Sequence, residues 1–216
     1  GALAIRAGCS VGAGPRDEVL AAVTTGSDTE SLDAGGACVV PGWVDPHTHA
    51  VYGRTRQDEY ERRIRGETYL EIAAAGGGIH ASVRDLRERS EADLIERTVK
   101  RLGELRSLGT TTVEIKSGYG LTFEDEVKML RAARSAAATA DLNAVFTCLA
   151  AHELPKEYAD RREEYVALVC EEILPAVVRD GLADRLGVVC EPTVFVLAET
   201  GAVLQRGMDL GLRAVG

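Results

Sequence analysis

The sequence has 216 residues, of which 45% are hydrophobic, so it can bury the core of one medium domain or of a large and a small one. Its formal net charge is −9, from 34 acidic and 25 basic side chains. A nucleic-acid partner and an anionic membrane surface both require a basic face, so we expect neither. No apolar run approaches the roughly 18 residues that a membrane span needs.

The five cysteines are widely spaced and include no CxxC pair. An odd count at wide spacing argues against a disulfide framework and favours a reducing compartment. The first residues, GALAIR, lack the charged region and following apolar stretch that mark a signal peptide. We therefore expect a cytoplasmic protein.

Residues 1–40 are rich in small side chains, and short apolar runs alternate there with turn-forming segments. The apolar runs at 19–23 and 37–40 are separated by turn-formers, including those at 33–36. Such spacing is typical of short strands joined by turns. We predict a small β unit for this part of the chain.

The pattern changes after residue 39. An apolar, strand-like stretch runs over residues 39–49, and a charged region follows it. Residues 69–75 are predicted to form a helix that the glycines at 76–78 end. A second helix is predicted to start after Ser90, whose side chain suits an N-terminal cap, and to end at Gly109.

The remainder of the chain alternates strands with helices. Strands are predicted at 110–115, 144–149, 186–190 and 213–215, and helices after a Thr122 cap, at about 161–179 and at about 197–210. Such alternation indicates parallel βα units. A closed (β/α)8 barrel has eight units in roughly 250 residues, and this chain holds about half of them. The pattern alone leaves open an incomplete barrel and a small, complete open α/β sheet.

The strongest chemical signal is the pair His47 and His49, at the end of the first strand of this alternation. Residues i and i+2 of a strand point to one face, so the two imidazoles converge on half a site for zinc or iron. An isolated His-x-His is weak evidence by itself. Its position after the run GWVDP, at the carboxyl end of a parallel strand, is where the active sites of barrels lie.

Residues 41–49, PGWVDPHTH, resemble the first-strand metal motif of the amidohydrolase superfamily. Further segments narrow this resemblance: YLEIAAAGGGI at 69–79, EIKSGYGL at 114–121, and EYV with CEE within 164–172. Together these segments resemble the imidazolonepropionases. The likeness spans about residues 35 to 210.

This resemblance implies a fold and a cofactor. Residues 41–216 would form the first half of a (β/α)8 TIM-type barrel, and residues 1–40 part of a small β-sandwich domain. One divalent metal, Zn or Fe, would be bound by His47 and His49. The full-length enzyme would be a homodimer of histidine degradation that hydrolyses the ring C–N bond of 4-imidazolone-5-propanoate to give N-formimidoyl-L-glutamate.

The resemblance also implies four substrate-binding side chains: Arg56, Tyr119, His152 and, less directly, Tyr69. A guanidinium suits the propionate of the substrate because it binds a carboxylate through two hydrogen bonds. The residues alone leave ordinary alternatives open. Arg56 lies among other arginines and would suit a solvated surface, Tyr119 would suit a turn stacked on the core, and His152 would suit a hydrogen-bonded core position.

The same resemblance implies that the site is incomplete. A further metal-binding histidine, an aspartate, and the carboxylate and histidine near the reacting water are expected beyond Gly216, so no catalytic residue is assigned here. We therefore expect the isolated chain to be a truncated form with little or no activity. Two alternatives stay open: another cyclic amidohydrolase or heterocycle deaminase, and a non-enzymatic fragment that binds a partner.

Overall fold

The computed structural model describes residues 1–215. By their internal contacts the residues divide into two compact units, Gly1–Pro41 and the chain from Gly42 onward. The boundary lies directly before the strand that carries the His-x-His motif, so that strand belongs to the second unit.

The first unit is a β-hairpin packed against one helix. β1 (Ala2–Arg6) and β2 (Cys9–Gly14) pair antiparallel through a turn at Ala7 and Gly8, whose φ angles of 49° and 77° suit a tight hairpin. α1 (Arg16–Ala22) follows Pro15. The strand predicted at 19–23 is therefore wrong: Pro15 and an acidic first turn favour a helix start. Residues 37–40, also predicted as a strand, have no strand structure.

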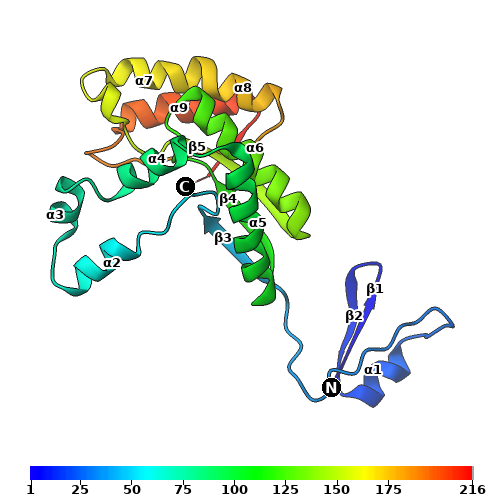
Figure 1. Ribbon diagram of the computed structural model, residues 1–216. Helices are drawn as coiled ribbons and strands as arrows, with labels where there is room; N and C mark the ends of the chain where they lie inside the picture. The colour runs from blue at the N-terminus through cyan, green and yellow to red at the C-terminus, as the bar shows by residue number, and fades with distance from the viewer. Residues whose placement is uncertain (216) are drawn as a thin grey trace. The chain divides into compact units, whose positions relative to one another are not determined.

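The second unit contains a five-stranded parallel sheet in the order β3-β4-β5-β6-β7, so each strand pairs with the next one along the chain. Its first three strands are labelled in Figure 1. Its strands are β3 (Trp43–Thr48), β4 (Thr110–Lys116), β5 (Asn143–Ala151), β6 (Arg185–Val188) and β7 (Arg213–Ala214). The predicted parallel α/β organisation is confirmed. The carboxyl ends of all five strands consequently lie at one edge of the sheet.

Helices follow the strands as predicted. They are α5 (Glu91–Ser107), α6 (Phe123–Ala140), α7 (Arg162–Leu168), a π-helical turn (Val169–Ile173), α8 (Leu174–Arg179) and α9 (Leu197–Asp209). The predicted caps are confirmed, because the side chains of Ser90 and Thr122 accept hydrogen bonds from the backbone of α5 and α6. Pro175 has no N–H to donate, which accounts for the wider π turn inside the helix over 162–179.

The connection from β3 to β4 contains three short helices: α2 (Gln57–Ile64), α3 (Tyr69–Ala74) and α4 (Ile79–Arg87). A one-turn 3-10 helix (Lys156–Tyr158) follows β5. Only α3 was expected within the connection, although α4 carries Ile79, Val83 and Leu86 at helical spacing. The glycines at 76–78 separate α3 from α4, and a Cβ on Gly77 would lie 2.7 Å from the Ile72 side chain.

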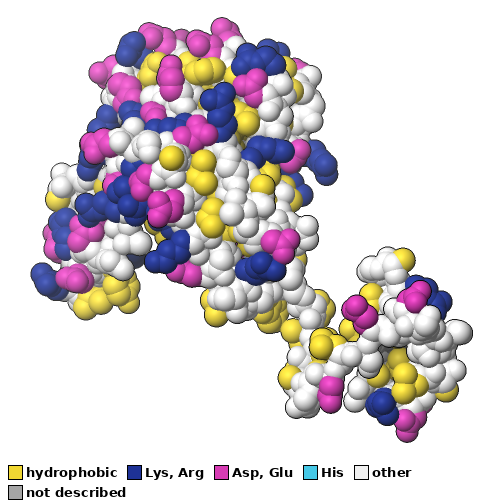
Figure 2. All heavy atoms as spheres, turned by 45° about the vertical axis from the view of Figure 1, so that its right-hand side comes forward, with side chains coloured by type: hydrophobic (Ala, Val, Ile, Leu, Met, Phe, Trp, Pro, Cys, Tyr) yellow, Lys and Arg dark blue, Asp and Glu magenta, His cyan; other side chains and the backbone are white. Residues whose placement is uncertain are grey.

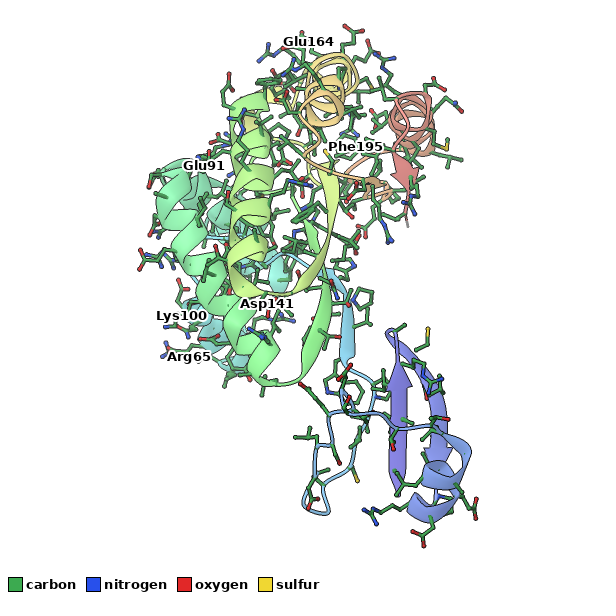
Figure 3. All side chains as sticks on the ribbon, turned by 90° about the vertical axis from the view of Figure 1, so that its right-hand side faces the viewer. Arg65, Glu91, Lys100, Asp141, Glu164 and Phe195 are labelled. Carbon is green, nitrogen blue, oxygen red and sulfur yellow. The ribbon has the colours of Figure 1, made fainter. Side chains whose placement is uncertain are left out.

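The core lies between the sheet and the helices, and α5 and α6 lie side by side along the sheet (Figure 3). The α7–α8 segment and α9 continue this layer. Phe195, labelled in Figure 3, is fully buried with its ring centroid 6.2 Å from that of Tyr165. The Tyr165 hydroxyl donates to the Ala150 carbonyl at 2.8 Å, which fixes the carboxyl end of β5 next to His152.

Acidic and basic side chains are interspersed on the face of the second unit shown in Figure 2. Many are paired at short range, including Arg89 with Asp85 and Asp93 at 2.8 Å each. Among the described residues, no helix is both long and apolar enough to cross a membrane.

Candidate metal and substrate site

Aromatic side chains from three neighbouring strand ends meet at the carboxyl edge of the sheet. His49 directly follows β3, Tyr119 lies in the turn after β4, and His152 directly follows β5. The ring centroid of His49 is 4.8 Å from those of both Tyr119 and His152. Three residues separated by up to 103 positions (152 − 49) thus form one cluster, which only the parallel strand order brings together.

His49 has the properties of a metal ligand. Burial, reinforced by His152, His47 and Lys116, lowers its pKa to about 3, so the ring is neutral at physiological pH. Its Nδ1 atom is buried without a hydrogen-bond partner. A neutral imidazole nitrogen with a free lone pair is the form that binds zinc or iron.

His47 provides a second imidazole, on an exposed side chain whose ring centroid is 5.9 Å from that of His49. A tetrahedral zinc with Zn–N bonds of about 2.0–2.1 Å would place the centroids of two imidazole ligands roughly 5.2 Å apart. The two rings lie slightly farther apart than that. Among residues 1–215, no group of three or more His, Cys, Asp or Glu side chains is placed to hold a metal. The chain thus offers half a site.

His152 is oriented by the turn after β4. Its Nδ1 atom is 2.9 Å from the carbonyl oxygen of Gly118. Because a carbonyl only accepts, Nδ1 carries a proton, and Nε2 is the ring nitrogen left for another partner. Burial lowers the pKa of His152, which favours the neutral ring with Nε2 as an acceptor.

Tyr119 lies between Gly118 and Gly120 and is half-buried, with its ring against those of His49 and His152. Burial raises the pKa of its phenol, so the hydroxyl stays protonated and can donate or accept a hydrogen bond. Gly118 has a φ of +109°, and a Cβ there would lie 2.8 Å from His152. This position requires glycine for both its backbone angle and its space.

Arg56 is held by Glu59 rather than being a free surface charge. Its Nε and Nη2 atoms each lie 3.0 Å from Glu59 Oε2. The other carboxylate oxygen, Glu59 Oε1, accepts a hydrogen bond from the Gly78 backbone N–H at 3.0 Å. Glu59, which is buried, therefore links the arginine to the glycine segment between α3 and α4.

The four side chains expected to bind substrate border one cavity of about 260 Å³. It is lined by Arg56, Tyr69, Tyr119 and His152, with Ile79, Glu153, Val189, Glu191 and Val194. Sequence reasoning missed the two acidic members, Glu153 and Glu191. Their signal was available, because both lie just after a strand, as His152 does.

A larger hollow of about 580 Å³ lies at the opposite, amino ends of β4 and β5. It is bordered by Arg106 and Asp141, which form an ion pair at 2.8 Å. No predicted site residue lines it, and it lies away from the carboxyl edge where the aromatic side chains meet.

A buried ion pair lies on β4, the strand that ends near His49. Lys116 Nζ is 3.0 Å from Glu114 Oε1, and the Thr147 hydroxyl on β5 donates to the same oxygen. The two side chains are only 6% and 8% exposed. Two charged side chains are stable in the interior only if they pair with each other and their remaining polar atoms are hydrogen-bonded.

Comparison with known proteins connects this site to one family. No protein-family profile matches the chain. Over 98% of the chain, it is 51% identical to an imidazolonepropionase of Symbiobacterium thermophilum, and over 99% it is 46% identical to one of Solibacter usitatus. An imidazolonepropionase of Pseudomonas putida is 46% identical over 92% of the chain. The matched region is 50%, 50% and 49% of these three proteins. The chain is thus a homologue of the imidazolonepropionases and spans about half the length of the curated relatives it matches.

Proposed function

We propose that this chain provides the first metal ligands and the substrate-binding side chains of an imidazolonepropionase-type hydrolase. The observation that carries the proposal is the single cavity bordered by Arg56, Tyr69, Tyr119 and His152, with His49 stacked against two of them. A cationic side chain, a phenol and an imidazole around one small cavity suit a ligand that has a carboxylate and a polar ring.

The architecture supports a barrel as the complete form. Five parallel strands follow one another in sequence order, and among residues 1–215 the edge strands β3 and β7 each pair on one side only. An eight-stranded barrel of roughly 250 residues would place strands against both edges. We propose that residues 41–216 are the first half of such a barrel, that residues 1–40 are part of a small β-sandwich domain, and that the full-length enzyme is a homodimer.

The proposed reaction is the hydrolysis of 4-imidazolone-5-propanoate. Water adds to the ring carbonyl carbon, the adjacent ring C–N bond breaks, and the released nitrogen takes up a proton to give N-formimidoyl-L-glutamate. Zinc or iron, held by His47 and His49 with ligands from outside this chain, would activate water and polarise the carbonyl group.

The residues of this chain bind and orient the substrate. Arg56 keeps an unpaired edge of its guanidinium while Glu59 fixes the other edge, so it is pre-organised for the propionate. His152, as a neutral ring with its proton on Nδ1, presents Nε2 as an acceptor for a ring N–H of the substrate. The Tyr119 hydroxyl can hydrogen-bond to a ring heteroatom from the same wall of the cavity.

A binding experiment on the full 216-residue chain tests the substrate proposal. Imidazole-4-propanoate is a stable probe with the same carboxylate tail and ring size, and its binding is measured by NMR titration. Arg56→Gln is expected to weaken binding roughly tenfold or more, because a charge-assisted pair is lost. Arg54→Gln is the matched control, since Arg54 is exposed and pairs with Asp58. Equal affinity for the wild type and Arg56→Gln would contradict the proposal.

Metal content tests the other half of the proposal. After equilibrium dialysis against a fixed concentration of Zn²⁺, elemental analysis is expected to show more bound zinc in the wild type than in His47→Ala/His49→Ala. His80→Ala is the control, because His80 lies on α4 outside the ring cluster. As much bound zinc in the double variant as in the wild type would rule out this pair as the ligands. Turnover of imidazolonepropionate by the isolated chain would contradict the expectation that two imidazoles do not complete the site.

A further inference from the structure

The turn that carries Tyr119, residues 117–121, has an unfavourable backbone. Gly118 has a φ of +109°, and Leu121, which is fully buried, has a φ of +55°. A left-handed conformation is costly for a leucine, so surrounding contacts must hold it. We refer to residues 117–121 as the Tyr119 turn.

Glu126 provides those contacts from inside the turn. Its carboxylate accepts backbone N–H hydrogen bonds from Gly118 at 3.1 and 3.2 Å, from Gly120 at 2.8 Å and from Leu121 at 3.0 Å. The side chain is fully buried, and within residues 1–215 it forms no ion pair with Lys or Arg. Its hydrogen bonds are therefore to residues 117–121, mostly to their backbone N–H groups and also to the Ser117 side chain.

The opposite side of the turn is held by Arg87 on α4. Its Nε atom donates to the Gly120 carbonyl at 2.7 Å, and its Nη1 atom pairs with Glu157 at 2.7 Å. Gly120 is thus bonded through its N–H to Glu126 and through its carbonyl to Arg87. A Cβ at Gly120 would lie 2.4 Å from the backbone nitrogen of Glu126, so the turn and the start of α6 are in close contact.

The Tyr119 turn positions two side chains of the site, those of Tyr119 and His152. It carries the Tyr119 ring, and its Gly118 carbonyl receives the hydrogen bond from His152 Nδ1. Rotation of the Gly118 peptide would move that carbonyl away from His152 and leave the ring free to change tautomer. The N–H of Gly118, which Glu126 holds, belongs to the peptide directly before this carbonyl.

We propose that Glu126 is a positioning residue, which through the backbone of the Tyr119 turn fixes the phenol of Tyr119 and the tautomer of His152 for ligand binding. This inference rests on the proposed function, which assigns both side chains to the substrate. Glu126 touches neither a ligand nor the metal-binding histidines, so its effect is indirect.

The test uses the full chain and two variants. Glu126→Leu keeps a similar volume but removes every acceptor from the three backbone N–H groups. Glu126→Gln keeps one acceptor oxygen and is expected to restore part of the effect. Glu124→Leu is the matched control, because Glu124 is exposed in the same first turn of α6.

The readouts separate positioning from a general loss of structure. In the ¹⁵N side-chain spectrum, the wild type is expected to show His152 with its proton on Nδ1, and Glu126→Leu is expected to lose this signature while far-UV circular dichroism stays unchanged. The affinity for imidazole-4-propanoate is expected to fall roughly tenfold, since buried donors left without an acceptor displace the turn. Glu124→Leu is expected to match the wild type in both.

The results with the Glu126 variants either support or overturn the positioning role. If Glu126→Leu does not fold, Glu126→Gln is compared alone, because an amide nitrogen in place of Oε2 cannot accept and removes one of the two acceptors of the Gly118 N–H. A folded Glu126 variant that keeps the wild-type His152 tautomer and affinity would overturn the inference. If the wild type itself does not bind imidazole-4-propanoate, the proposed substrate is wrong, while the His152 spectrum still tests the positioning role.

Discussion

Replacement of Lys116 by methionine tests how much the buried ion pair on β4 stabilises the second unit. Lys116 Nζ and Glu114 Oε1 are 3.0 Å apart, with side chains 6% and 8% exposed. At this distance two unit charges attract by about 5.5 kcal/mol if the effective dielectric constant is about 20. Lys116→Met removes that attraction and leaves the Glu114 carboxylate buried with only the Thr147 hydroxyl as a partner.

We expect Lys116→Met to lower the free energy of unfolding by about 3–5 kcal/mol, the usual effect of removing one member of a buried pair. Native domains are stable by only about 5–15 kcal/mol, so the loss is large enough to measure. Guanidinium unfolding followed by far-UV circular dichroism gives the value. Lys100→Met is the control, because Lys100 is exposed on α5 (Figure 3), and its change is expected to stay within about 0.5 kcal/mol.

A double variant isolates the interaction from the loss of packing. Glu114→Gln/Lys116→Met has no buried charge at this position and keeps an acceptor for Thr147, so we expect it to be more stable than Lys116→Met. The reasoning is refuted if Lys116→Met costs less than about 1 kcal/mol, or if the double variant is less stable than the single one.

Three further predictions concern single positions. Gly118→Ala is expected to lower the free energy of unfolding by at least about 2 kcal/mol, because Gly118 has a φ of +109° and a Cβ there would contact His152. Gly103→Ala is the control: it has open space in α5 and should raise the free energy of unfolding by about 0.5–1 kcal/mol, as thermal unfolding can show. Burial raises the pKa of Cys148 to about 12, so iodoacetamide at pH 8 should modify this thiol only after the protein unfolds. Mass spectrometry measures the modification, and labelling of the native protein at Cys148 as fast as at the exposed cysteines would contradict the prediction. The hydrogen bond from Arg89 lowers the pKa of Asp85, so the stability it contributes is complete above about pH 4 and is lost as pH falls through the lower folded-state pKa. Asp85→Asn should therefore flatten the decline of unfolding free energy below about pH 4, and an unchanged slope would exclude this contribution.

Local features of the chain were predictable because they depend on close neighbours in sequence. The caps at Ser90 and Thr122 require only a hydroxyl before an acidic first turn, and both form as expected. The alternation of strands and helices after residue 110 follows from apolar periodicity, and each predicted strand there exists in the sheet. Short segments were less predictable, since residues 19–23 carry an apolar run that suits a strand and yet lie largely in α1.

The candidate site residues were predicted from motifs that resemble those of the family. The four segments that carry this resemblance lie within the region shared with the imidazolonepropionases. The sequence thus predicted His47 and His49 as candidate ligands, and it predicted the parallel character of the sheet, which the structure confirms. It also indicated that the glycines at 76–78 end a helix, and in the structure Gly76 and Gly78 have positive φ angles while Gly77 packs closely against Ile72.

Only the tertiary structure decided how these residues meet. The stacking of His49 on Tyr119 and His152, the hydrogen bond from the Gly78 N–H to Glu59 and the hydrogen bond from Arg87 to the Gly120 carbonyl join positions that no local pattern relates. Such contacts depend on strand order and on which side chains remain buried after packing, because a buried carboxylate or imidazole is stable only where a specific partner satisfies it. The sequence therefore determines which groups are available, and the parallel sheet determines which of them act on one another.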